Sequence, residues 1–204
     1  MTDISGRLPG KEFFENILRR VRDIPFSYVI KMTTGYDVYS ITEEDDEVVA
    51  EIYEKAKEVV EEAQGEDFSS LRPNEVSVRL EGMLREKLSG IIPENKFAGY
   101  PNILIERGGK AYYIEVKLAE KNQLNSTFRT FYYEPVEFSK VTRNACHIII
   151  GFLHEKKKIT GFKMIDAARI KVSLKCEFNT SNIELYKKEN IVREWSIKPL
   201  PNKL

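Results

Sequence analysis

Two short apolar runs separated by a pair of glycines are the most regular pattern in the chain. The runs are Ile103–Arg107 and Lys110–Leu118, and the residues between them are Gly108 and Gly109. A glycine pair in this setting predicts a two-residue β-hairpin, because both turn positions tolerate a positive φ. We expect the rest of the fold to be organised around this hairpin.

The register of the predicted hairpin separates apolar from polar side chains. If Arg107 lies opposite Lys110, then Asn102 lies opposite Glu115, and side chains alternate between the two faces. One face is apolar throughout and holds Ile103, Ile105, Tyr112, Ile114, Val116 and Leu118. The other face gathers Asn102, Glu115 and Lys117 at one end, where facing Cβ atoms are about 5 Å apart.

Amphipathic helices are predicted on the N-terminal side of the hairpin from apolar residues at helical spacing. The predicted helices are Lys11–Arg22, Thr42–Ala63 and Asn74–Leu88. Thr42 and Asp45 have the spacing of a capping box, and Pro73 suits the first turn of the third helix. The stretch Pro25–Ile41 mixes aromatic and β-branched residues, and it fits either a hairpin or a functional loop.

Strands are predicted on the C-terminal side. Cys146–Leu153 is a continuous apolar run, which is typical of a central strand covered on both faces. Ile159–Ile165 and Val172–Phe178 are expected to be further strands, the first of them after a turn at Lys156–Lys158. Together these elements predict an α/β domain with a mixed central sheet of about five strands flanked by helices.

The polar end of the hairpin suggests phosphate chemistry. Mg²⁺ prefers oxygen ligands, often one or two carboxylates completed by water and phosphate oxygens, and Glu115 with Asn102 can supply such ligands. Lys117 beside them can contact a phosphate or position an attacking water. The alternative is a solvated strand end that carries Glu and Lys without a function.

These residues resemble a known motif. Pro101-Asn102, followed thirteen residues later by Glu115-Val116-Lys117, resembles the signature of the PD-(D/E)xK nucleases, and the resemblance covers about residues 74–185. Asn102 departs from the family, which has Asp there, so one oxygen ligand is kept and its charge is lost. The resemblance implies a restriction-endonuclease-like core in which Asn102, Glu115 and Lys117 are catalytic and Mg²⁺, or Mn²⁺ in its place, is the cofactor.

The resemblance also implies a glutamate from the preceding helix. Glu75 is the best match for this additional catalytic and metal-binding residue, followed by Glu81 and Glu86. The alternative for Glu75 is a residue that only satisfies the dipole in the first helical turn.

Candidate DNA contacts follow the hairpin. The stretch QLNSTFRTFYYEP is rich in aromatic and hydroxyl residues around one arginine, and short polar groups just beyond a phosphate-cleaving lysine suit contacts with phosphates or base edges. The predicted DNA-binding residues are Ser126, Thr127, Arg129 and Thr130, together with Lys140 and Arg143 from the next stretch.

Composition limits the other possibilities. The net charge is zero, which argues against a generic nucleic-acid coat, yet residues 42–67 hold twelve acids against two lysines. Residues 156–175 hold seven lysines or arginines against one aspartate, so the charge pattern suits a protein that presents one face to a polyanion and keeps the other away from it. Cys146 and Cys176, like the two histidines His147 and His154, lack the spacing of a metal or redox site.

No apolar run approaches the roughly 20 residues that span a bilayer, and the N-terminal residues lack the apolar stretch that is typical of a signal peptide. We therefore expect a cytoplasmic protein with no membrane contact.

The sequence thus predicts one nuclease domain over residues 1–204, with a mainly helical part at 1–70 and the catalytic core at 74–185. The favoured function is a Mg²⁺-dependent type II restriction endonuclease that cuts double-stranded DNA as a homodimer. The alternatives are a structure-selective nuclease such as a junction resolvase, and a catalytically impaired DNA-binding module of the same fold.

Overall fold

The computed structural model describes residues 22–96, 98–126, 131, 133–134, 139–174 and 180–193. The chain divides into two compact units, the larger of which is Arg22–Ser173. In the smaller unit, residues 1–21 and 174–204, the described part holds the short helix α5 (Asn182–Leu185) and a 3-10 turn, Lys188–Asn190. The helix predicted at Lys11–Arg22 lies outside the described residues except for Arg22.

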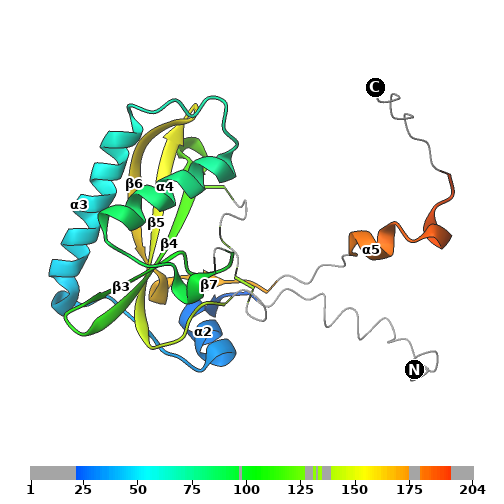
Figure 1. Cartoon of the computed structure of the whole chain (residues 1–204). Coiled ribbons are helices and arrows are strands. Elements are labelled where there is room, and N and C mark those ends of the chain that lie inside the picture. The colour runs from blue at the N-terminus through cyan, green and yellow to red at the C-terminus, as the bar shows by residue number, and fades with distance from the viewer. Residues whose placement is uncertain are drawn as a thin grey trace, which may run out of the picture. The chain divides into compact units, whose positions relative to one another are not determined.

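A mixed sheet of five strands forms the centre of the larger unit (Figure 1). The strands are β2 (Val38–Tyr39), β3 (Ile103–Arg107), β4 (Lys110–Glu120), β5 (Ala145–Glu155) and β6 (Lys158–Asp166). Their order is β2-β5-β4-β3, with β6 also paired to β5. The β4–β5 pair is parallel, whereas β3–β4 and β5–β6 are antiparallel. This sheet confirms the predicted fold class and the central position of the Cys146–Leu153 run.

The β3–β4 hairpin has the predicted register. Arg107 pairs with Lys110, and Ile103 pairs with Ile114. Both turn glycines have a positive φ, 56° for Gly108 and 77° for Gly109, as the two-residue loop requires.

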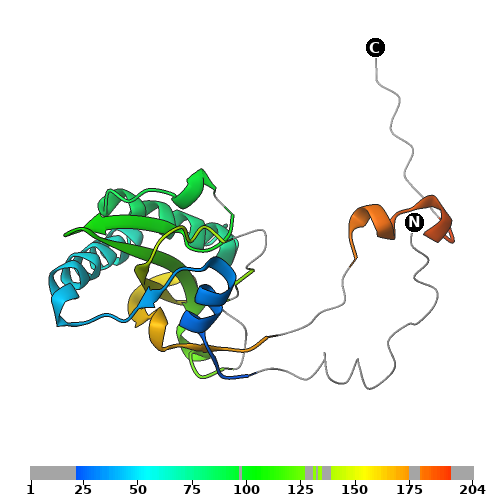
Figure 2. The same cartoon turned by 90° about the horizontal axis from the view of Figure 1, so that it is seen from below.

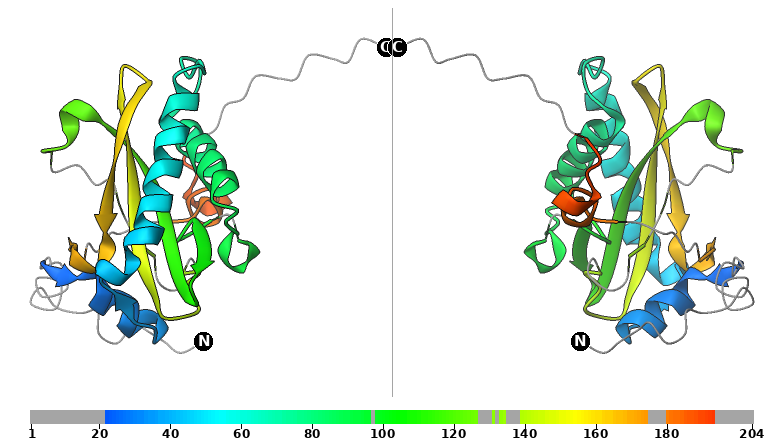
Figure 3. Two further views of the ribbon diagram at one scale, coloured as in Figure 1. Left: turned by 90° about the vertical axis from the view of Figure 1, so that its left-hand side faces the viewer. Right: turned by 90° about the vertical axis from the view of Figure 1, so that its right-hand side faces the viewer.

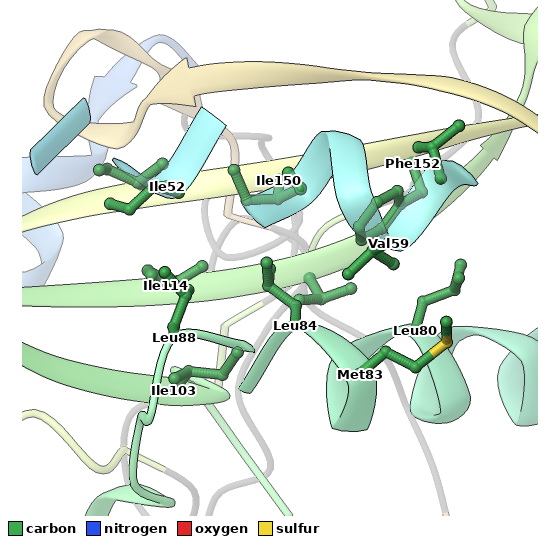
Figure 4. Packing of buried hydrophobic residues seen from close by; sticks show 14 of the residues in the cluster. Ile52, Val59, Leu80, Met83, Leu84, Leu88, Ile103, Ile114, Ile150 and Phe152 are labelled. Atoms are coloured by element: carbon green, nitrogen blue, oxygen red, sulfur yellow. The ribbon is translucent and has the colours of Figure 1, made fainter. Parts of the chain in front are cut away.

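Two helices cover one face of the sheet, α3 (Asp46–Ala63) and α4 (Pro73–Lys87), and they lie side by side in Figure 3. Figure 4 shows their apolar side chains meeting those of the strands. The labelled side chains are Ile52, Val59, Leu80, Met83, Leu84, Leu88, Ile103, Ile114, Ile150 and Phe152, all in one buried cluster. The predicted capping box precedes α3, because the carboxylate of Asp45 accepts from the backbone N–H of Thr42 at 2.9 Å.

The stretch that the sequence left open forms helix α2 (Phe26–Thr34), away from α3 on the other side of the hairpin (Figure 2). Its Phe26 and Ile30 are fully buried in a second cluster with Leu104 and Tyr113, which alternate with the residues facing α4. The helix ends at Gly35, whose φ of 81° allows its N–H to reach the Lys31 carbonyl. Residues 26–34 therefore form a helix because one helical face is buried against the sheet, and not because their intrinsic helix propensity requires it.

A separate two-stranded pair joins β1 (Ile24–Pro25) to β7 (Lys171–Val172). The strand predicted at Val172–Phe178 is thus represented by Val172 alone, and residues 175–179 lie outside the described part. Within the described residues, no helix has the length and apolar character needed to cross a membrane.

Candidate active site

Strand β4 places the acid and the lysine of the motif together on the face opposite α3. The Lys117 Nζ lies 2.6 Å from the Glu115 Oε1, and the side chains of the two residues are 25% and 5% exposed. The other carboxylate oxygen, Glu115 Oε2, is buried and has no hydrogen-bond partner among the described residues. A buried anionic oxygen without a partner is costly, and it is the kind of atom that a hard cation binds.

The charge of Glu115 depends on its neighbours. Burial raises the pKa of this carboxyl group, while the positive charges of Lys117 and Lys140 and the backbone N–H of Asn102 lower it. Burial is the larger effect, so the pKa of Glu115 lies above its usual value, and a bound cation would favour the charged form.

Asn102 stands beside Glu115, as the register predicted. Its backbone N–H donates to the Ile114 carbonyl at 3.1 Å, and its Oδ1 accepts from the backbone N–H of Val116 at 2.7 Å. The side chain thus ties the start of β3 to β4. An amide oxygen has two lone pairs, so Oδ1 retains one that can face a cation.

The structure changes the choice of helix glutamate. Glu75 is exposed in the first turn of α4, where its Oε2 accepts from the backbone N–H of Arg72 at 2.6 Å. This contact fits the alternative role of a residue that stabilises the helix start. Glu81, six residues later, lies near the site, because the charges of Glu115 and Lys117 both act on its carboxyl group.

Glu81 is largely buried and paired with a neighbouring arginine. Its side chain is 16% exposed and accepts from Arg85 at 3.3 Å. Burial raises the pKa of Glu81, and the negative charge of Glu115 adds to that effect, while Arg85 and Lys140 oppose it. The helix glutamate that interacts electrostatically with Glu115 and Lys117 is therefore Glu81.

Lys140 was predicted to contact DNA, and the structure corrects this. The residue is 1% exposed, and its Nζ donates to the Lys96 carbonyl at 3.0 Å. Burial lowers the pKa of Lys140, while the negative charges of Glu115 and Glu81 raise it. The side chain is enclosed beside the acids of the site and cannot reach a DNA surface.

Aromatic rings surround the site on the α2 side of the sheet. The ring of Phe131 lies 5.7 Å from the Lys117 Nζ, and it packs edge-on against Phe26 and Tyr100. Tyr100 also shares a 2.7 Å hydrogen bond with Nδ1 of His147, whose pKa burial lowers to about 3. The histidine is therefore neutral at pH 7 and forms part of the buried wall of the site.

The other predicted DNA contacts have different settings. Ser126 is exposed just beyond the 3-10 turn that ends β4, and its backbone N–H donates to the Gln123 carbonyl at 2.9 Å. Thr127, Arg129 and Thr130 lie outside the described residues.

Arg143 lies away from this site. It forms an ion pair with Glu106 and lines a cavity of about 720 Å³ together with Lys110, at the opposite end of β4 from Lys117. The predicted DNA-binding role of Arg143 therefore has no support from its position.

Sequence reasoning ranked Glu81 second and did not predict that Lys140 is buried. A signal existed for Glu81, since it directly follows Leu80 and borders the apolar stripe of α4. No local signal marks Lys140, because its burial depends on a contact with Lys96, 44 residues earlier in the chain.

A mixed sheet with helices on both faces, carrying an acid, a lysine and an amide on one hairpin, has the architecture of a restriction-endonuclease-like nuclease. Residues 20–189 match the model of the type II restriction enzyme MjaV family, and the chain belongs to this family. The type II restriction enzyme MjaV of Methanocaldococcus jannaschii is 33% identical over 220 aligned positions, which cover 92% of this chain and 96% of that relative. No solved structure matches the chain.

Family membership confirms the class predicted from the sequence, a type II restriction endonuclease. Enzymes of this type generally use a divalent metal ion and act on DNA.

Proposed function

We propose that this chain hydrolyses phosphodiester bonds of double-stranded DNA at a specific short site, in a Mg²⁺-dependent reaction centred on Glu115 and Lys117. The observation that carries the proposal is the buried Oε2 atom of Glu115, which has no partner among the described residues while Oε1 pairs with Lys117. Membership of a type II restriction enzyme family supports the choice of DNA as substrate.

The proposed metal ligands are Glu115 and Asn102, with Glu81 joining directly or through water. Among the described residues no three His, Cys, Asp or Glu side chains gather around one point, so water and phosphate oxygens have to complete the coordination. This is the usual manner of binding for Mg²⁺, which keeps several waters, and Mn²⁺ is expected to substitute for it. Held by these residues, Mg²⁺ would supply Lewis-acid polarisation of the phosphoryl oxygen and would stabilise the leaving 3′ oxygen.

Lys117 is proposed to act on the phosphate and the attacking water. Its ammonium group is held beside Glu115 but remains partly exposed, so it can meet a phosphate without losing its carboxylate partner. The ring of Phe131 borders it on one side and restricts the approach of bulk water. Lys117 therefore orients the nucleophile while Glu115 and Asn102 hold the cation.

DNA contacts are proposed for Ser126, Thr127, Arg129 and Thr130. The position of Phe131 against Lys117 supports this proposal, because it brings the end of the same segment to the site. A serine just beyond the 3-10 turn that follows β4 and an arginine three residues later in the sequence suit contacts with phosphates or base edges.

Digestion of unmethylated plasmid DNA with Mg²⁺ tests the proposal, with Glu115→Gln as the control. Discrete fragments that disappear in the Glu115→Gln digest are the expected result. A smear, or equal cutting by both proteins, would contradict it. Cutting of four-way junctions alone would favour a structure-selective nuclease.

A second candidate function rests on Asn102, which lacks the charge of the family's usual Asp. A DNA-binding module that has lost catalysis would bind DNA without cutting it at any Mg²⁺ or Mn²⁺ concentration. The same digestion, combined with a gel-shift assay, distinguishes this module from the enzyme.

The enzyme is proposed to work as a homodimer. Two identical active sites related by a twofold axis are the simplest way to cut both strands of a symmetric duplex site. Sedimentation should give a mass of two subunits on a duplex that the protein cuts. A monomer both free and on that duplex would argue against this arrangement.

A further inference from the structure

A second lysine lies in register with Lys117 across the sheet. Lys117 of β4 pairs with Gly151 of β5, and Gly151 pairs with Lys163 of β6. Residues in register on neighbouring strands project from the same face of a sheet, so these three residues form a cross-strand row. The Cα atoms of the two lysines are separated by two strand spacings, about 10 Å.

The packing of β6 shows which face of the sheet the row occupies. Phe162 and Met164 pack against the apolar cluster beneath α3 and α4, whereas Ile165 packs against the cluster on the α2 side. Side chains alternate along a strand, so Lys163 shares the face of Ile165. This is the face that carries Lys117, and α3 and α4 lie on the other side of the sheet (Figure 3).

Gly151 leaves an opening between the two lysines. It is half-buried within β5, where a glycine weakens a strand, and its φ does not lie in the left-handed region that favours glycine. An added Cβ would meet no atom of the described residues closer than 3.8 Å, so internal packing does not require a glycine either. A glycine inside a strand often marks a place where a ligand or another backbone comes close.

Lys163 has no internal partner for its charge. Its side chain is exposed, and its ammonium group forms no hydrogen bond or ion pair within the described part of the chain. Lys117, by contrast, is paired with Glu115 at 2.6 Å. Lys163 therefore adds an uncompensated positive charge to this face, and a lysine binds a phosphate as a point charge.

We propose that the cross-strand row binds the backbone of one DNA strand, with Lys163 on a phosphate near the scissile one and Gly151 allowing the strand to approach the sheet. This inference rests on the proposed function, because it places the scissile phosphate at Lys117. The separation of about 10 Å between the lysines corresponds to about three base-pair steps of B-DNA. The contact is with the backbone, so it is independent of base sequence.

The salt dependence of DNA binding tests the part of Lys163. Fluorescence anisotropy in EDTA, where no metal-dependent cleavage occurs, is measured on a duplex with the cut site and on a scrambled duplex. Lys163→Met should weaken binding to both evenly, by about five- to tenfold at 0.1 M salt, and reduce the slope of log K against log salt by about one. Lys57→Met removes an exposed lysine of α3 on the other side of the sheet, and this matched control should change neither quantity.

Neutral methylphosphonate linkages locate the contact on the DNA. They are placed one at a time at the three phosphates on each side of the cut. One of them should weaken binding by the wild type and have no further effect on Lys163→Met, because the contact is already lost. Equal effects of every linkage on both proteins would overturn the contact.

Gly151→Val tests the approach of the strand to the sheet. Valine favours strands, so the midpoint of thermal unfolding should stay the same or rise. DNA binding should fall by at least about tenfold, because the added methyl groups occupy the space of the DNA backbone. If Gly151→Val has no cooperative thermal transition, Gly151→Ala takes its place, since its Cβ has room, and it should weaken binding by a smaller measurable factor.

The outcomes separate this inference from the proposed function. Wild-type binding by Lys163→Met or by a folded Gly151 variant overturns the inference, and so does an equal loss in Lys57→Met. Self-association of Lys163→Met with unchanged DNA binding also overturns it, because the lysine would then only protect the edge of the sheet. If the wild type cuts no DNA with Mg²⁺ or Mn²⁺, the proposed function fails. If the wild type cuts at a specific site and the variants bind DNA as it does, only this inference fails.

Discussion

The Oδ1 atom of Asn102 accepts a hydrogen bond from the backbone N–H of Val116 at 2.7 Å. Val116 is the residue between the acid and the lysine of the motif, so the amide fixes the start of β3 against the centre of the candidate site. The position therefore has a structural use that an aspartate could also serve, since a carboxylate oxygen accepts the same hydrogen bond.

Asn102→Asp should strengthen metal binding and speed Mg²⁺-dependent cleavage. The carboxylate keeps the hydrogen bond with the backbone N–H of Val116. Its second oxygen is charged and takes the place of the uncharged NH2 group of the amide. We expect a gain of about tenfold in Mn²⁺ affinity, measured on the free protein. Asn102→Ala, which removes the acceptor altogether, is the control and should lower both stability and cleavage. Equal metal binding and equal cleavage in Asn102→Asp would show that residue 102 is no ligand.

Glu81 and Glu75 offer a matched comparison on one helix. Glu81→Gln should slow cleavage by about tenfold or more and weaken Mn²⁺ binding, because it removes an acidic group beside Glu115. Glu75→Gln should leave cleavage rates unchanged and reduce the free energy of unfolding by at most about 1 kcal/mol, through the helix start. Cleavage assays and urea unfolding of both variants check this. The reverse pattern would restore Glu75 as the helix acid of the site.

Lys117 and Arg129 should separate catalysis from recognition. Lys117→Ala should bind a cleavable duplex but cut it at least about 100-fold more slowly, because the lysine acts on the reacting phosphate. Arg129→Ala should lose about 1–3 kcal/mol of binding free energy on the specific site if the arginine contacts a base, and weaken all sequences evenly if it contacts a phosphate. Gel shifts at two salt concentrations and single-turnover cleavage measure both. Normal cutting by Lys117→Ala would remove the hairpin as the active site.

Asp45 should make stability depend on acid pH. Burial raises the pKa of its carboxyl group, but hydrogen bonds from Thr42, Tyr112 and Lys110 outweigh burial and lower the pKa from 3.8 to about 2. Because the folded pKa is the lower one, the ionised form stabilises the fold above pH 3.8, and this contribution is lost as the pH falls toward 2.

Asp45→Asn should therefore cost about 1–2 kcal/mol of unfolding free energy at pH 7, and the difference from wild type should shrink below pH 4. Tyr112→Phe removes the 2.7 Å hydrogen bond from the Tyr112 hydroxyl to the Asp45 carboxylate. It should reduce the unfolding free energy by a smaller amount than Asp45→Asn does. Urea unfolding between pH 7 and pH 2.5 measures both. A cost for Asp45→Asn that does not change with pH would contradict this account.

The sequence by itself determined the hairpin and its chemistry. Alternation with a period of two, together with Gly108-Gly109, fixed the register that places Asn102 opposite Glu115, because a shift by one residue would expose the whole apolar face. The stripes of α3 and α4 were equally readable, since each helix buries one face and a period of 3.6 residues marks it. These are local patterns, and they are visible without knowledge of the neighbours.

Only the tertiary structure decided which charged residues join the hairpin. Phe26–Thr34 became α2 because Phe26 and Ile30 fit the far face of the sheet, not because of local preference. The packing of α4 against β4 buries most of Glu81 and leaves Glu75 exposed. The packing of the segment before β5 buries Lys140 and leaves Arg143 exposed. The sequence shows that a lysine or a glutamate is present, but its burial and its partners depend on packing between segments that are distant in the chain.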